Sequence, residues 1–103
     1  EILNLPYPIE LNDQPAIVGR RVSAEEYANM IIDQFDVLME MKNSQPIVFP
    51  ISLHTFIAGQ PFRQKHLKRA LQHICKRRDE IWMTTPNEIS MFYRELPADK
   101  QLK

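Results

Sequence analysis

The sequence predicts an α/β fold, in which short apolar segments alternate with amphipathic helices. Apolar runs at residues 2–5, 47–53 and 80–84 have the length and composition of strands. Between and after these runs, apolar residues have the spacing of amphipathic helices, and helix-capping signals precede two of the helical segments. The order strand, loop, helix, strand, helix, strand, helix is typical of βαβ units. We therefore expect three consecutive βα units whose parallel strands are covered by helices.

The first apolar run leads into a stretch without sustained periodicity. Prolines, Gly19 and the pair Asn12-Asp13 interrupt both helical and strand patterns over residues 7–22. We predict a long loop there. Loops of this length in compact domains are usually functional or disordered.

The first predicted helix covers residues 24–42. Ser23 and Glu26 have the spacing of a capping box, in which the serine hydroxyl accepts from the backbone three residues later. Tyr27, Ile31 and Phe35 then follow the three-and-four spacing of one buried stripe.

The second half of the chain repeats the pattern of strand and helix. The run 47–53 is apolar on both faces, as in a strand covered by helices, and Pro50 argues against a central antiparallel strand. A helix is expected over residues 63–78. After the third predicted strand, Thr85 caps a terminal helix with Pro86 at its first position.

Composition describes one small domain with an uneven charge. Residues 1–61 carry eight acidic and three basic side chains, whereas residues 62–103 carry five acidic and ten basic ones, so the net charge is zero. The single cysteine, Cys75, allows no internal disulfide. It gives no sign of an oxidising compartment, so we expect a cytoplasmic protein. No apolar stretch approaches the length of a membrane span, so we expect no membrane partner. The first residue, Glu1, looks like a cut end.

His54 is the residue that says most about chemistry. It follows an apolar segment and precedes a loop shaped by Gly59 and Pro61 that opens a helix at Arg63. α/β enzymes place catalytic groups at such strand ends. Each residue also has a simpler interpretation. His54 could be bonded only to backbone, Gly59 and Pro61 could form a plain turn, and Arg63 could pair with an acidic neighbour.

A family resemblance rests on these residues. Leu53-His54, the spacing Gly59-x-Pro61-x-Arg63, the pair Ile81-Trp82 and the segment 5–13 resemble the end of the polysaccharide deacetylase family. The similarity is greatest to the subgroup that includes metal-independent allantoinases and peptidoglycan deacetylase-like proteins. It covers nearly the whole chain. It implies that residues 1–103 are a single fragment, the last part of a deformed (β/α) barrel.

The resemblance implies part of a hydrolase that acts on carbon–nitrogen bonds other than peptide bonds. Its substrate would be an amino sugar carrying an acetyl group or a related small amide. His54 matches the general acid of the family, which protonates the leaving nitrogen. Asn12, Asp13 and Arg63 would bind substrate, and Gly59 and Pro61 would shape the loop. Thr55 stands where many members have proline, which favours the allantoinase-like subgroup.

The metal-binding and catalytic-base motifs of the family have no match in this sequence. We therefore expect no metal ligands in this chain, zinc or another divalent metal in a complete protein, and no activity of the chain alone. The partner would be the missing N-terminal part of the barrel, or a second copy that associates through exposed strand edges.

Two other classes of function remain open. The chain could be a non-catalytic remnant that serves as a structural or binding fragment. Alternatively, the basic helix 63–78 could bind nucleic acid through its positive side chains. No helix-turn-helix, zinc finger or stacking platform accompanies that helix, so we do not expect nucleic acid as a partner. The basic residues are Lys65, Lys68, Arg69, Lys76, Arg77 and Arg78.

Overall fold

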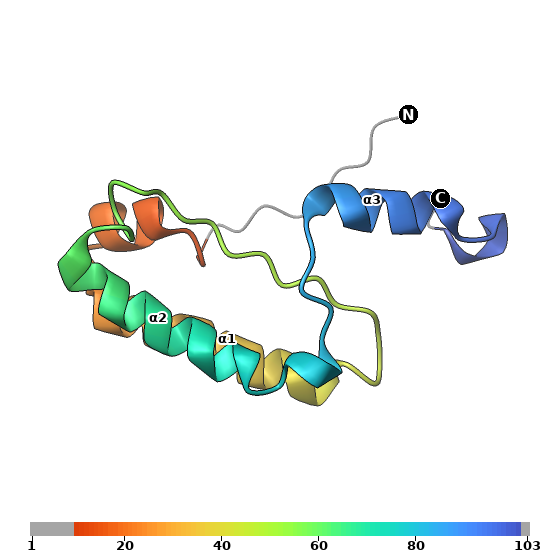
Figure 1. Ribbon diagram of the computed structural model, residues 1–103, viewed down its shortest axis with the longest axis horizontal. Coiled ribbons are helices and arrows are strands. Elements are labelled where there is room, and N and C mark those ends of the chain that lie inside the picture. Colours follow the sequence, from red (N-terminus) through yellow and green to blue (C-terminus); the bar gives the residue numbers. More distant parts are fainter. Residues whose placement is uncertain (1–9, 102–103) are drawn as a thin grey trace. The chain divides into compact units, whose positions relative to one another are not determined.

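The computed structural model of the chain describes residues 10–101 (Figure 1). These residues belong to two compact units, one ending at Arg77 and the other beginning at Arg78. All of the candidate site residues lie in the first unit.

The first unit is built on two helices, α1 (Ala24–Met41) and α2 (Pro61–Cys75), which pack against each other (Figure 1). A short π-helical segment, η1 (Gln14–Gly19), precedes α1 within the stretch expected to be a loop. An extended segment returns from the end of α1 to the start of α2, so the two helices run in the same direction.

Helix α1 confirms the prediction made from its capping signal and its apolar spacing. The backbone N–H of Glu26 donates to the Ser23 hydroxyl at 3.1 Å, which satisfies a donor that the first helical turn leaves open. Tyr27, Ile31 and Phe35 are each no more than 3% exposed. The stripe along α1 therefore forms much of the core of this unit.

Helix α2 begins two residues earlier than predicted, because Pro61 takes the first helical position and Gln60 the cap. It buries Ala70 and Ile74 and leaves most of its basic side chains exposed. Two polar contacts join it to α1. The Arg69 guanidinium donates to the backbone carbonyl of Glu25 at 3.3 Å, and His73 Nε2 lies 2.7 Å from Asp36 Oδ1.

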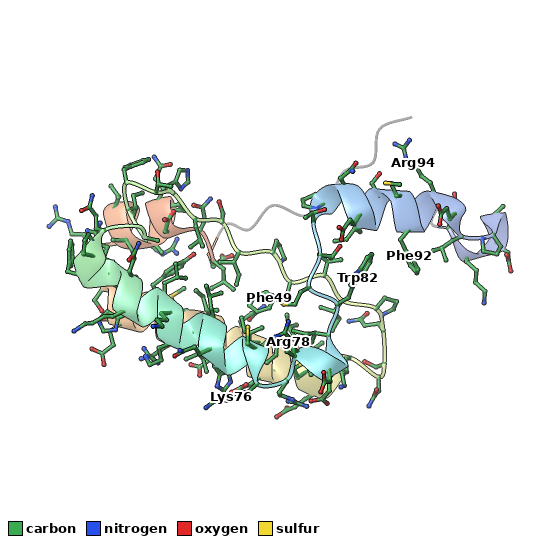
Figure 2. The ribbon with its side chains drawn as sticks, in the orientation of Figure 1. Phe49, Lys76, Arg78, Trp82, Phe92 and Arg94 are labelled. Atoms are coloured by element: carbon green, nitrogen blue, oxygen red, sulfur yellow. The ribbon has the colours of Figure 1, made fainter. Side chains whose placement is uncertain are left out.

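The second unit consists of a short helical turn, η2 (Arg78–Glu80), helix α3 (Pro86–Glu95) and a final turn, η3 (Ala98–Lys100). As predicted, the Thr85 hydroxyl caps α3 by accepting from the Glu88 N–H at 3.2 Å. Trp82, before the helix, meets Phe92 edge-to-face with ring centroids 5.6 Å apart (Figure 2). Both rings remain 56% exposed.

The predicted α/β class is wrong, because residues 10–101 form helices and no sheet. The parallel strands expected over residues 47–53 and 80–84 are absent, and with them the βα units of a barrel; the run at 2–5 lies outside the described residues. One isolated parallel bridge joins Asn12 to Ser52. The Ser52 N–H donates to the Leu11 carbonyl at 3.0 Å, and the Asp13 N–H donates to the Ser52 carbonyl at 3.1 Å.

Local chemistry explains why this pairing stops after one bridge. In a parallel ladder the next donor beyond Ser52 would be the N–H of His54, but it donates to the Asp13 carboxylate at 2.7 Å. The backbone of Asp13 is already helical, with φ −62° and ψ −32°, and η1 follows. Two residues before Ser52, Pro50 has no N–H to donate. The apolar composition of 47–53 instead serves helix contacts, such as Phe49 stacked on Phe35 at 6.2 Å.

The absence of strands also removes the expected mechanism of self-association. Residues 10–101 present no strand edges, so association between copies stays a prediction without that mechanism. Among these residues, the helices are too short or too polar to cross a bilayer.

The cap of α1 gives a test of the first unit. Ser23→Ala removes the acceptor for the Glu26 N–H and should lower the free energy of unfolding by about 1 kcal/mol. Ser23→Asp keeps an acceptor and should stay within about 0.5 kcal/mol of the parent. Urea unfolding followed by circular dichroism measures both. Equal stability of the two variants would contradict the capping role.

Candidate functional site

The centre of the candidate site is the carboxylate of Asp13, which is fully buried at 0% exposure. Its Oδ1 lies 2.7 Å from His54 Nδ1. Its Oδ2 accepts from two backbone N–H groups, those of His54 at 2.7 Å and Ala58 at 3.2 Å. A buried carboxylate is costly unless its oxygens are hydrogen-bonded, and here three donors surround it.

His54 is held at two points by this carboxylate. Because Nδ1 faces Asp13 Oδ1, the ring has a fixed orientation, and its side chain is 31% exposed. Nε2 has no hydrogen-bond partner among the residues that the structure describes. The arrangement suits an imidazole that exchanges a proton at Nε2 while Nδ1–H stays bonded to a carboxylate.

The segment after His54 is a tight turn, which backbone hydrogen bonds and buried side chains hold in place. The His54 carbonyl accepts from the N–H groups of Ile57 and Ala58, both at 3.0 Å, and both of these side chains are buried. A Cβ at Gly59 would come within 2.3 Å of the Thr55 carbonyl oxygen. Only glycine therefore lets the turn close at this point.

Arg63 and Pro61 stand where the turn enters α2. The Arg63 guanidinium donates to the Ile57 carbonyl at 3.2 Å, and its Cζ lies 4.7 Å from the centroid of the Phe62 ring. Pro61 is exposed at the first position of the helix. The arginine thus holds the turn from its outer end.

Asn12 and Tyr27 hold the chain segments that carry Asp13 and His54. The Asn12 side-chain oxygen accepts from the Gln14 N–H at 3.2 Å, which turns the chain into η1. The Tyr27 hydroxyl, in a side chain that is 3% exposed, donates to the Ser52 carbonyl at 3.2 Å. Burial, and in lesser degree the Asp13 charge, raise the pKa of Tyr27 well above its ordinary value. The hydroxyl therefore stays protonated and keeps this bond.

The structure brings all six residues named from the sequence into one region. They are His54, Asn12, Asp13, Arg63, Gly59 and Pro61. Two of them lie in places other than those the sequence suggested: Asp13 is buried beneath His54, and Asn12 is 7% exposed within a turn. Sequence reasoning gave no role to Tyr27, whose only signal was its place on the apolar stripe of α1.

The described residues do not form a metal centre. Within residues 10–101, no three histidine, cysteine, aspartate or glutamate side chains come together as a ligand set. His66 and His73 are spaced seven residues apart on α2, and His73 is bonded to Asp36. Two shallow hollows lie along α2, and exposed Cys75 borders both.

A comparison with known proteins found a distant similarity. Over 91 residues the chain is 29% identical to a Schizosaccharomyces pombe protein named "Putative polysaccharide deacetylase". The match covers 86% of this chain and 28% of that protein, so the chain spans little more than a quarter of the relative's length. No family model matches the sequence, and no solved structure matches it.

The turn after His54 can be tested with a matched pair of glycine substitutions. Gly59→Ala forces a Cβ against the Thr55 backbone and should cost about 1–3 kcal/mol of unfolding free energy. In Gly19→Ala the new Cβ would meet only the Gln14 carbonyl at 3.9 Å, an ordinary contact, so stability should change by less than about 1 kcal/mol. Denaturant unfolding measures both, and similar losses would contradict the close approach.

The raised pKa of Tyr27 predicts how stability depends on alkaline pH. In the unfolded chain, the tyrosine hydroxyl loses its proton at about pH 10. The folded protein keeps this proton to higher pH, so the folded state binds more protons and its stability falls as pH rises above that value.

Tyr27→Phe should remove this part of the alkaline loss, while costing about 1 kcal/mol at pH 7 through the hydroxyl's bond to Ser52. Unfolding free energies measured from pH 7 to 11 test this, with Tyr93→Phe on α3 as the control. An unchanged alkaline slope in Tyr27→Phe would contradict it.

Proposed function

We propose that this chain carries the acid side of the active site of a hydrolase that cleaves carbon–nitrogen bonds other than peptide bonds. One observation carries the proposal: His54 is fixed by a buried carboxylate at Nδ1, and its Nε2 has no partner among residues 10–101. The similarity to a protein named polysaccharide deacetylase supports a hydrolase of this general kind.

The step assigned to His54 is delivery of a proton to the leaving nitrogen. When the carbon–nitrogen bond breaks, the nitrogen keeps the electron pair of that bond and needs a proton. The doubly protonated ring supplies it from Nε2 and becomes neutral, while Nδ1–H remains donated to Asp13. Imidazole suits this step because it gains and loses a proton near neutral pH.

Asp13 acts in this proposal as a positioning residue. Its side chain is inaccessible, so the carboxylate serves the histidine rather than the substrate. The two bonds to His54, one from the ring and one from the backbone, keep Nε2 directed outward. Catalysis by a general acid depends on such placement, since the acid must lie within hydrogen-bond reach of the atom it protonates.

The substrate class we propose is an amino sugar with an acetyl group, or a related small amide. Asn12 and Arg63 are bonded within the site, through the bond from the Gln14 N–H to Asn12 and the bond from Arg63 to the Ile57 carbonyl, and we propose that they lie on the substrate side of His54. Thr55, which stands where many polysaccharide deacetylases have proline, is the reason that the proposal includes small amides of the kind cleaved by the allantoinase-like subgroup.

The rest of the reaction needs groups that residues 10–101 do not provide. The ligand set for a zinc ion or another divalent metal is absent from them, so the steps assigned to this chain use its own side chains alone. We propose that the attacking water, its base and any metal are held by the remainder of a longer protein, of which this chain is an incomplete part that is inactive alone. A non-catalytic remnant is the alternative.

Substitution of His54 in the complete protein tests the proposal. His54→Ala should lower kcat for amide hydrolysis by about 10²- to 10⁴-fold, the usual contribution of a general acid. His66→Ala, which removes a histidine from α2, should stay within about twofold. Release of acetate from N-acetylglucosamine oligomers and ring opening of allantoin are the two assays.

Two results would contradict the proposal. Activity of His54→Ala within about threefold of the parent would remove the general-acid role. No hydrolysis of either substrate by the complete parent protein would favour a remnant without catalytic function.

A further inference from the structure

We infer that Phe56 is a specificity-determining residue that contacts the ring of the substrate whose leaving nitrogen His54 protonates. The inference rests on the proposed function and extends it from the reaction to the shape of the ligand. The shared chemistry is a ring with a flat face that either carries the scissile nitrogen as a substituent or contains it as a ring atom.

The first support is the exposure of Phe56 within an ordered turn. Its side chain is 63% exposed, whereas the next two residues, Ile57 and Ala58, are 1% and 4% exposed. The Ala58 N–H is bonded to Asp13 and the Gln60 side chain donates to the Phe56 carbonyl at 3.4 Å. Phe56 is therefore held outward by its neighbours.

The second support is the position of the ring relative to the acid. The centroids of the His54 and Phe56 rings lie 5.6 Å apart, and their planes meet at 68°. In this edge-to-face contact, the phenyl ring forms a wall beside the imidazole. At this distance from the imidazole, the phenyl ring is within reach of a substrate ring whose nitrogen is bonded to Nε2, and this contact is the one we infer.

The chemistry of that surface selects its ligand. A phenyl face gives no hydrogen bonds, and it favours flat apolar groups through dispersion and desolvation. Two substrates of the proposed reaction present a flat face at the scissile bond: the C–H face of a pyranose that carries the amide, and a planar nitrogen heterocycle that contains it. An acyclic amide presents none.

Phe62 provides a matched comparison from the same loop and helix. It is equally exposed, at 65%, but the guanidinium of Arg63 lies over its ring. Phe62 does not contact His54 through any described ring pair. A general effect of losing an exposed phenylalanine should therefore appear in both Phe56 and Phe62 variants, and a substrate contact in Phe56 alone.

The test measures kcat and KM of the complete protein for N-acetylglucosamine oligomers, allantoin and an acyclic N-alkylacetamide. Phe56→Ala should raise KM about three- to tenfold for a ring substrate, leave its kcat within about twofold, and leave the acyclic amide unaffected. Phe56→Tyr should retain the parental KM, and Phe62→Ala should behave as the parent. Whichever ring substrate responds identifies the source of the flat face.

The outcomes separate this inference from the proposed function. A loss in His54→Ala without any KM effect in Phe56→Ala would overturn the inference and keep the acid role. Equal effects of Phe56→Ala on all three substrates, or a fall in kcat alone, would show that the ring only steadies His54. A KM effect shared with Phe62→Ala would also overturn it, as a general surface effect.

Discussion

The buried carboxylate of Asp13 is the interaction on which the rest of the first unit depends. A charge with no access to water requires donors, and the chain supplies them from the His54 ring and from two backbone N–H groups. These donors come from residues more than forty positions away in the sequence. Satisfying one side chain therefore fixes the turn after His54 against the segment that leads into η1. Among residues 10–101, no buried side-chain nitrogen or oxygen is left without a hydrogen bond.

The same bond accounts for both the success and the failure of prediction from sequence. The helices were predictable because their signals are local: Ser23 and Thr85 cap the turns that follow them, and the stripe of α1 repeats every three or four residues. The absence of a strand over residues 47–53 was not predictable, because these apolar residues suit either a sheet or an extended segment packed on helices. What decides between these is where the His54 N–H donates, and this depends on Asp13, a distant residue.

The candidate site shows a similar division. His54 could be singled out from the sequence, because it lies between an apolar run and a Gly-Pro loop, the pattern on which the resemblance was based. The Asn12-Asp13 pair was noticed as well, but the sequence could not tell a carboxylate that faces substrate from one buried under a histidine. The exposed fraction of the Asp13 side chain makes that distinction, and this fraction depends on three-dimensional packing. Tyr27 illustrates the limit, since a tyrosine on an apolar stripe looks like any other core residue until its hydroxyl is seen to reach Ser52.

In the proposed function, the turn from His54 to Gly59 serves both the folding and the chemistry of the chain. Its inner face is closed by the buried side chains of Ile57 and Ala58, and the backbone at Gly59 lies too close to Thr55 for any side chain. A rigid backbone is what a proton donor needs, because an error in position lowers the rate of transfer. The residues that make this turn stable are therefore also those that keep Nε2 in place. Under the proposed function, substitutions in the interior of the turn should therefore lower the rate of proton transfer from His54, even though they never meet the substrate.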